Sequence, residues 1–235
     1  MELPRTMHGQ LYLLAYCRKC RRFEYGSDDP WAIRWRFGFA LESAMLADLY
    51  LAGYLDDQEG RARRVSYSSH GDQVLDATVN KAPGRLWSEV ITVEGREARN
   101  VVREQLETEG WISGKERRTF GFLPRSRQAV HDVDMVEMLA ARVTEALVNA
   151  LADRPADPRS LAVGLIAVEA HLPVVDMFNA NTDANTKRRN LLREMMLGAI
   201  EPVRGFHQAI QDQYVERGFG APSRCVGGSS AGYSG

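Results

Sequence analysis

The chain has 235 residues, of which 44% are hydrophobic and 26% charged, and its 30 lysines and arginines nearly balance its 31 aspartates and glutamates. This composition is typical of a globular protein and excludes a uniformly basic nucleic-acid binder, so an anion-binding site must be local. The length suits one domain, because a chain of this size buries most of its unfolded surface in a single core.

Cysteine content and hydropathy indicate a reducing compartment. The three cysteines, Cys17, Cys20 and Cys225, follow no charged-then-apolar leader, so we expect a cytoplasmic protein without a disulfide framework. Cys17 and Cys20 have the spacing of half a zinc site, but the sequence has no second pair. We therefore expect two free thiols, and no metal or other cofactor. No stretch reaches the roughly 20 apolar residues of a transmembrane helix, so membrane contact should be peripheral. Only four of the 30 cations are lysine, a bias that suggests a bacterial source.

Helical periodicity dominates the first half of the chain. Apolar spacing and capping residues predict helices at residues 36–51, from the cap Asp72 to Pro83, and at 96–109. Between the first two helices, Asp56-Asp57 and Gly60 predict a turn that precedes a short strand at 61–66.

A β-hairpin is predicted to interrupt the helices between Trp111 and Pro124, with its turn at Gly114-Lys115. Further helices are predicted at 133–151, from Pro158 through the apolar and therefore buried segment 161–170, from Thr182 or Asp183 through Met195, and at 202–217. Residues 218–235 are rich in glycine and serine and predict a flexible tail, which limits the folded domain to residues 1–217.

Five segments together resemble the Golgi phosphoprotein 3-like family, and they follow the family's order and spacing. They are 44–55 (AMLADLYLAGYL), 71–76 (GDQVLD), 96–112, 157–172 and 183–192 (DANTKRRNLL). The animal and yeast members are adaptors that bind phosphatidylinositol 4-phosphate. The resemblance implies a mainly α fold, a compact bundle of amphipathic helices around a buried helix with a projecting β-hairpin. The periodicity independently predicts the same class.

Arg96, Arg99 and Arg103 are candidates for an anionic head-group site. Their i, i+3, i+7 spacing places them on one side of a helix, and guanidinium groups bind phosphate through paired, charge-assisted hydrogen bonds. A solvated face paired with Glu97, Glu104 and Glu107 is the alternative from the residues alone. The resemblance assigns Arg96 and Arg99 to the family's phosphate-binding helix arginines.

Two other pocket positions depart from the family. The pocket tryptophan falls on Ile33, between Trp31 and Trp35, which are our candidates to flank the head group. The remaining pocket arginine falls on Glu42, where a carboxylate would repel phosphate. Either Arg34 or Arg36 would then have to supply the missing charge.

The predicted hairpin, residues 115–126, combines basic and apolar side chains. The candidates for membrane contact or oligomerisation are Lys115, Arg117, Arg118, Arg125, Phe120, Phe122 and Leu123. In the resembled family this element inserts into the bilayer and helps oligomerisation. Apolar residues at a tip can bury at the acyl boundary while arginines meet anionic head groups, but packing of the phenylalanines on the protein's own helices is an equal alternative.

Enzyme signatures are weak. The five histidines form no H-E-x-x-H motif, and no Gly-x-Ser-x-Gly elbow is present. Glu169 and His171 could form a buried polar pair at the end of an apolar helix. We expect a non-enzymatic peripheral membrane adaptor whose partners are anionic phospholipid and possible further copies of the chain. An enzyme or small-molecule binder with a repurposed pocket, and a purely protein-binding domain, are the alternatives.

Overall fold

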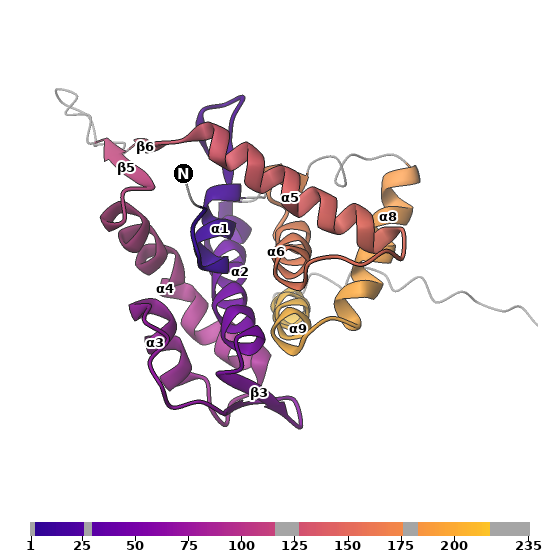
Figure 1. Ribbon diagram of the computed structural model, residues 1–235. Helices are drawn as coiled ribbons and strands as arrows, with labels where there is room; N and C mark the ends of the chain where they lie inside the picture. Colours follow the sequence, from indigo (N-terminus) through magenta and orange to yellow (C-terminus); the bar gives the residue numbers. More distant parts are fainter. Residues whose placement is uncertain (1–2, 26–29, 116–126, 176–182, 217–235) are drawn as a thin grey trace, which may run out of the picture.

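The protein is mainly helical, as predicted, and its central element is helix α2 (Pro30–Leu51). The computed structural model describes residues 3–25, 30–115, 127–175 and 183–216. Helix α2 contacts α1, α3, α4, α6 and α9 and runs through the middle of the molecule (Figure 1). The other helical elements are α1 (Met7–Leu14), α3 (Gln73–Lys81), α4 (Trp87–Thr108), α5 (Val133–Leu151), α6 (Pro158–Glu169), η1 (Pro173–Val175), α8 (Asp183–Leu197) and α9 (Glu201–Glu216).

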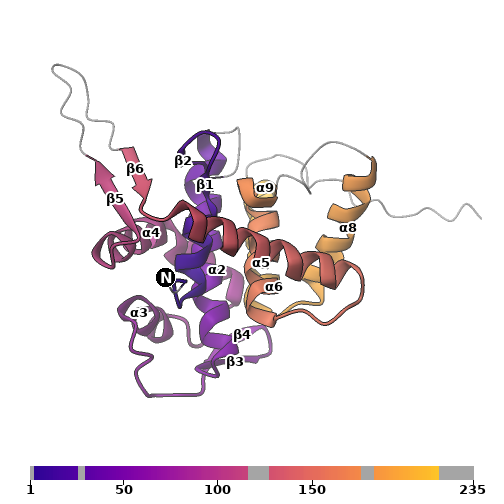
Figure 2. The ribbon, with the colours of Figure 1, turned by 45° about the horizontal axis from the view of Figure 1, so that its top comes forward.

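The described strands form three antiparallel hairpins. They are β1 (Tyr16–Cys17) with β2 (Arg22–Phe23), β3 (Leu55–Gln58) with β4 (Arg61–Arg64), and β5 (Ile112–Lys115) with β6 (Arg127–Val130). The β1–β2 and β5–β6 hairpins lie at one end of the molecule, and β2 contacts β6 (Figures 1 and 2). The β3–β4 hairpin lies at the opposite end.

Helices α2 and α4 approach closely because glycines meet where they cross. An added Cβ at Gly38 would lie 2.0 Å from the carbonyl oxygen of Gly95, and one at Gly95 would lie 2.8 Å from the ring of Phe39. Only glycine leaves room for backbone against backbone at this point. The contact fixes α4, and hence its arginines, against the central helix.

The first backbone N–H group of helix α1 donates its hydrogen bond to a side chain of another helix, α2. Its cap residue, Thr6, makes no side-chain capping bond. Instead, the backbone N–H of Met7 donates to Asp48 Oδ2 on α2 at 2.8 Å, and Arg159 on α6 forms an ion pair with the other oxygen at 2.6 Å. Asp48 is 1% exposed, so this carboxylate is buried with both oxygens satisfied.

Most predicted helices are confirmed. Asp72 caps α3 by accepting from the backbone N–H groups of Val74 and Leu75, and Pro158 occupies the first turn of α6, where a missing N–H costs nothing. Helix α6 is buried along its apolar segment, as predicted. The tail predicted at 218–235 lies outside the described residues.

Several predicted boundaries and turns are wrong. The helix predicted at 36–51 begins at Pro30, and the one predicted at 96–109 begins at Trp87 and runs through Gly95. Asp56-Asp57 lies in β3, where Asp56 faces Arg63 across the pair, so the turn falls at Glu59-Gly60. Gly114-Lys115 lies in β5 and pairs with residues 127–128, so these two residues do not form the turn. In the two hairpins, cross-strand pairing overrides a local turn signal.

We predict that Gly38→Ala destabilises the protein. Alanine gains about 1 kcal/mol of helix propensity, but the backbone collision costs at least the ~1–3 kcal/mol of an overpacked core. We therefore expect a lower urea midpoint with an unchanged slope, measured by circular dichroism. Gly198→Ala is the control, because its Cβ would meet nothing closer than 3.8 Å. Equal midpoints for Gly38→Ala and wild type would show that the crossing is not tight.

Candidate functional site

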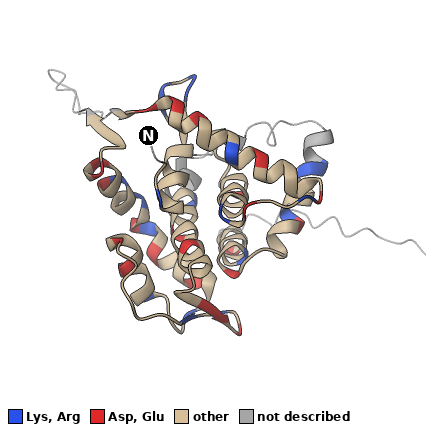
Figure 3. Cartoon of the chain, in the orientation of Figure 1, with Lys and Arg blue, Asp and Glu red and all other residues tan. Residues whose placement is uncertain are grey.

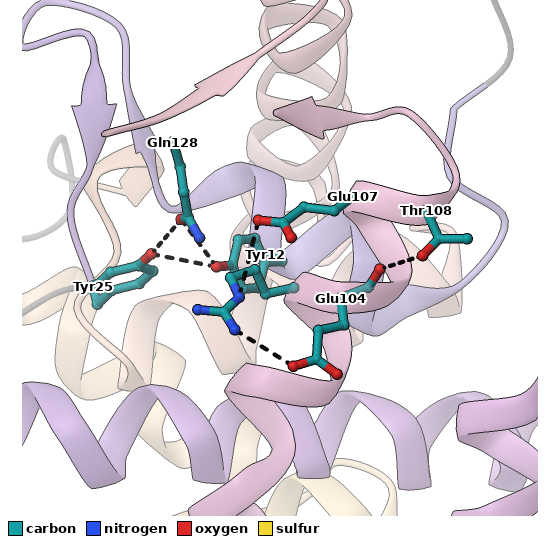
Figure 4. Close-up of polar contacts among 7 residues, drawn as sticks. Tyr12, Tyr25, Glu104, Glu107, Thr108 and Gln128 are labelled. Atoms are coloured by element: carbon teal, nitrogen blue, oxygen red, sulfur yellow. Dashed lines mark hydrogen bonds and ion pairs between the residues drawn. The ribbon is translucent and has the colours of Figure 1, made fainter. Parts of the chain in front are cut away.

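Arg99 lies on an aromatic platform. Its guanidinium carbon is 4.3 Å from the ring centroid of Tyr25, and the side chain is half-buried. The Tyr25 hydroxyl donates to Gln128 Oε1 at 3.1 Å, and Tyr12 donates to the same oxygen at 3.2 Å (Figure 4). Burial, with Tyr25 nearby, raises the pKa of Tyr12, so its hydroxyl stays neutral. These contacts therefore link four segments of the chain: α1 through Tyr12, the residues after β2 through Tyr25, α4 through Arg99 and β6 through Gln128.

The other two predicted arginines have different neighbours. Arg96 is exposed and lines a groove between α3 and α4, which neither Arg99 nor Arg103 lines. Arg103 Nη2 lies 3.5 Å from Glu104 Oε1, and its Nε lies 4.0 Å from Glu107 Oε1. The three arginines thus share one side of α4 but not one pocket. Arg103 therefore fits the alternative predicted from the residues alone, in which the arginines of this helix face pair with neighbouring glutamates.

Trp35 and Arg36 contribute to packing. Trp35 contacts Phe39 and Tyr214 at ring centroid distances of 5.2 and 6.3 Å. Arg36 is buried, donates a hydrogen bond to the Tyr214 hydroxyl and lies over the rings of Trp35 and Tyr214. It therefore cannot replace a surface pocket arginine. Trp31 and Arg34 lie in the first turns of α2, and their side chains are outside the described part of the structure.

The predicted membrane hairpin is only partly described. Strands β5 and β6 hold its base, with Ile112 paired to Val130. The predicted tip residues Arg117, Arg118, Phe120, Phe122, Leu123 and Arg125 lie outside the described residues, as does the side chain of Lys115. Membrane insertion and oligomerisation through this hairpin stay predictions.

A second basic element, missed by sequence reasoning, lies next to this hairpin. The β1–β2 turn carries four cations, and Figure 3 shows it as a blue loop at the same end of the molecule. Arg18 pairs with Glu137 and Arg22 with Glu24, whereas Lys19 and Arg21 make no ion pair within the described residues. The run C-R-K-C-R-R could have been recognised as basic, but only the fold places it beside β6.

The groove between α3 and α4 has a volume of about 980 Å³ and contains Glu42 at its base. This carboxyl group is 3% exposed, and its Oε1 has no hydrogen-bond partner within the described residues. Burial raises the pKa of Glu42 to about 8; Glu94 adds to the shift, whereas Lys81 and Arg85 oppose it. Glu42 is therefore largely protonated at neutral pH, and the repulsion of phosphate expected from its sequence position is weakened.

One end of this groove is closed by a polar chain. Gln105 Nε2 donates to Asp72 Oδ2 at 2.6 Å, so its oxygen is left to accept from Nε2 of His8 at 2.9 Å. His8 is fully buried, and this burial lowers its pKa, so the ring is neutral. Its Nδ1 then carries no proton and has no partner within the described residues.

Glu169 forms a buried pair with a residue other than the predicted one. His171 is exposed and lies just past the end of α6. The partner is His207 on α9, whose Nδ1 lies 3.2 Å from Glu169 Oε1. Burial opposes ionisation of Glu169, but the hydrogen bond from His207 and the charges of Arg193 and Arg36 outweigh it and lower the pKa of Glu169. The pair ties α6 to α9.

We predict that Glu42 makes stability depend on pH. Between its unfolded pKa of about 4.3 and its folded value near 8, the folded protein keeps a proton that the unfolded chain releases. Stability should therefore fall as pH rises through this window, by at most ~1.4 kcal/mol per pH unit. Glu42→Gln removes that loss, so its advantage over wild type should grow from pH 5 to pH 8 in urea titrations.

Glu104→Gln provides the control, because Glu104 lines the same groove but is exposed. Its stability curve should run parallel to that of wild type. A Glu42→Gln curve that also ran parallel would mean that Glu42 is ionised in the folded protein.

Comparison with known proteins is consistent with this architecture. Among the described residues, no helix combines the length and apolarity needed to span a membrane. No curated protein matches the chain. The model of the family described as Golgi phosphoprotein 3 (GPP34) matches residues 8–209, which is most of the chain. The α2 helix, the capped α3 helix and the arginine-bearing α4 all lie within that match, and the chain belongs to the Golgi phosphoprotein 3 family.

Proposed function

We propose that the protein is a peripheral membrane adaptor that binds anionic phospholipid head groups through Arg99 and the β1–β2 turn. Membership of the Golgi phosphoprotein 3 family supports membrane association at the level of the family. The observation that carries the proposal for this chain is the half-buried guanidinium of Arg99, which forms no ion pair within the described residues.

The setting of Arg99 suits a phosphate ligand. A partly buried cation loses part of its hydration free energy, and among the described residues no carboxylate compensates this loss at Arg99. The contact with the Tyr25 ring compensates only about 0.5–2 kcal/mol of it. The guanidinium N–H donors remain available for paired hydrogen bonds with phosphate oxygens. The ring also holds the guanidinium in place before the ligand arrives, which lowers the entropy cost of binding.

The β1–β2 turn adds charge at the same end of the molecule. Lys19 and Arg21 are exposed, and each basic residue near an anionic bilayer contributes about 1 kcal/mol to binding. The neighbouring β5–β6 hairpin extends from the same end (Figures 1 and 3). A bilayer that meets this end would therefore contact the basic turn, and Arg99 lies against Tyr25, which follows β2 of the same hairpin.

Selectivity for phosphatidylinositol 4-phosphate would be a narrower proposal, and two features of the pocket argue against it. The family's remaining pocket arginine is replaced by Glu42, which is buried, and Arg36 is held by Tyr214. Because fewer cations surround a single phosphate, the surface charge of the membrane should govern the binding affinity more than the shape of the head group. We expect anionic vesicles of equal surface charge to bind equally, with or without the phosphoinositide.

A small-molecule site in the α3–α4 groove is the second candidate. Glu42 favours it, because a buried carboxyl group with an unpartnered oxygen and a raised pKa at the base of a groove is typical of a ligand or acid–base site. This groove lies along α3 and contains none of the proposed lipid-binding residues, so Glu42→Gln separates the two functions.

The test is co-sedimentation with vesicles of phosphatidylcholine alone, with added phosphatidylglycerol, and with phosphatidylinositol 4-phosphate at matched charge. Lys19→Gln/Arg21→Gln should remove about 2 kcal/mol, or roughly 30-fold in affinity, and Arg99→Gln about fivefold or more. Binding should also weaken with salt. Phe120→Ala/Phe122→Ala tests insertion of the hairpin tip.

Two controls make the result specific. Arg63→Gln removes an exposed cation from the β3–β4 hairpin at the other end, and Glu42→Gln alters only the groove; both should bind like wild type. Dependence on the phosphoinositide together with Arg99 would establish the narrower proposal. Absence of binding to every vesicle would overturn the membrane function and direct attention to the α3–α4 groove.

A further inference from the structure

Cys17, Cys20 and Glu24 converge at the β1–β2 turn. Cys17 ends β1, Cys20 lies in the turn, and Glu24 follows β2. The two sulfur atoms and a carboxylate oxygen all lie within 4.8 Å of one another. The three potential ligand atoms therefore face a common point.

The backbone conformation of the β1–β2 turn brings these three side chains together. Cys17 pairs with Arg22 across the hairpin, and the backbone N–H of Cys20 donates to Cys17 Sγ at 3.3 Å. Arg21 adopts a left-handed conformation with φ of 50°, which closes the turn. Backbone N–H donation to a cysteine sulfur stabilises the thiolate that a metal would bind. Arg22 donates two hydrogen bonds to Glu24 Oε1, at 3.0 and 2.9 Å, and orients the carboxylate.

We propose that Cys17, Cys20 and Glu24 form a zinc-binding site. A tetrahedral ion with Zn–S bonds near 2.3 Å separates its ligands by about 3.8 Å, so side-chain shifts of about 1 Å suffice. Two thiolates favour a soft or borderline ion, and a carboxylate oxygen is a regular third ligand of zinc. The fourth position is left to water. Sequence spacing showed only half a site, because it could not place Glu24 beside the thiols.

The two thiols and the carboxylate supply up to three negative charges when they bind an ion, which offsets the repulsion from the basic residues of the turn. On binding, Zn²⁺ replaces two thiol protons, which pass to solvent, and no electron is transferred.

The test uses full-length protein carrying Cys225→Ser, so that the turn holds the two remaining cysteines. Cobalt(II) is added under reduction by a phosphine that does not bind the metal, and zinc is then used to displace it. We expect one bound ion per chain, sulfur-to-cobalt charge-transfer absorption, and visible bands with the intensity of a four-coordinate site. Calorimetry with zinc alone should give the same stoichiometry.

Single variants assign the ligands. Cys17→Ser or Cys20→Ser should weaken cobalt binding by about 100-fold or more and reduce the charge-transfer band. Glu24→Gln should weaken binding at least 10-fold, since loss of even an outer-shell partner costs about 10- to 100-fold. Glu137→Gln, which removes the nearby carboxylate paired with Arg18, should have no effect. The proposal is overturned if reduced protein gives no charge-transfer band, or if either serine variant binds cobalt like the parent.

Discussion

The close crossing of α2 and α4 at Gly38 and Gly95 is the constraint on which both candidate sites depend. It brings α4 so near the central helix that Glu42, one turn beyond Gly38, becomes the base of the α3–α4 groove. On the other side of the crossing, Arg99, one turn beyond Gly95, reaches Tyr25. A wider separation would hydrate Glu42 and lower its pKa, and it would move Arg99 away from its ring. Two glycines therefore set the electrostatics of residues several ångströms away.

The distribution of cations explains how a nearly neutral chain can have a basic end. Some arginines outside the β1–β2 turn are neutralised locally, such as Arg63 by Asp56 and Arg85 by Glu94. Pairs of this kind cancel charge at a distance and contribute little stability when exposed. Cations without carboxylate partners, in contrast, project a field to about a Debye length. Within the described part of the chain, Lys19, Arg21 and Arg99 belong to this second group.

The architecture was largely predictable from the sequence, whereas the sites were predictable only in part. Helices with strong periodicity or good caps, such as α3 with Asp72, were confirmed because their signals are local. The turn at Asp56-Asp57 was mispredicted because cross-strand pairing with β4 overrides the preference of aspartate for turns. The spacing of the α4 arginines placed them on one side of the helix and allowed the pairing of Arg103 with Glu107. It cannot show that Arg99 meets Tyr25, 74 residues earlier. Burial of Glu42 and its raised pKa likewise arise from elements distant in sequence.

The buried carboxylate of Asp48 has a consequence for how the chain is made. Helix α1 is synthesised before α2 and α6, but its leading N–H group is satisfied by Asp48 on α2, and Asp48 is itself neutralised by Arg159 on α6. Eight residues are too few for a helix to be stable alone in water. At about 5–20 residues per second, the ribosome needs roughly 10–30 s to extend the chain from Met7 to Arg159. During that interval Asp48 lacks its cationic partner, so stable docking of α1 on α2 has to wait for α6.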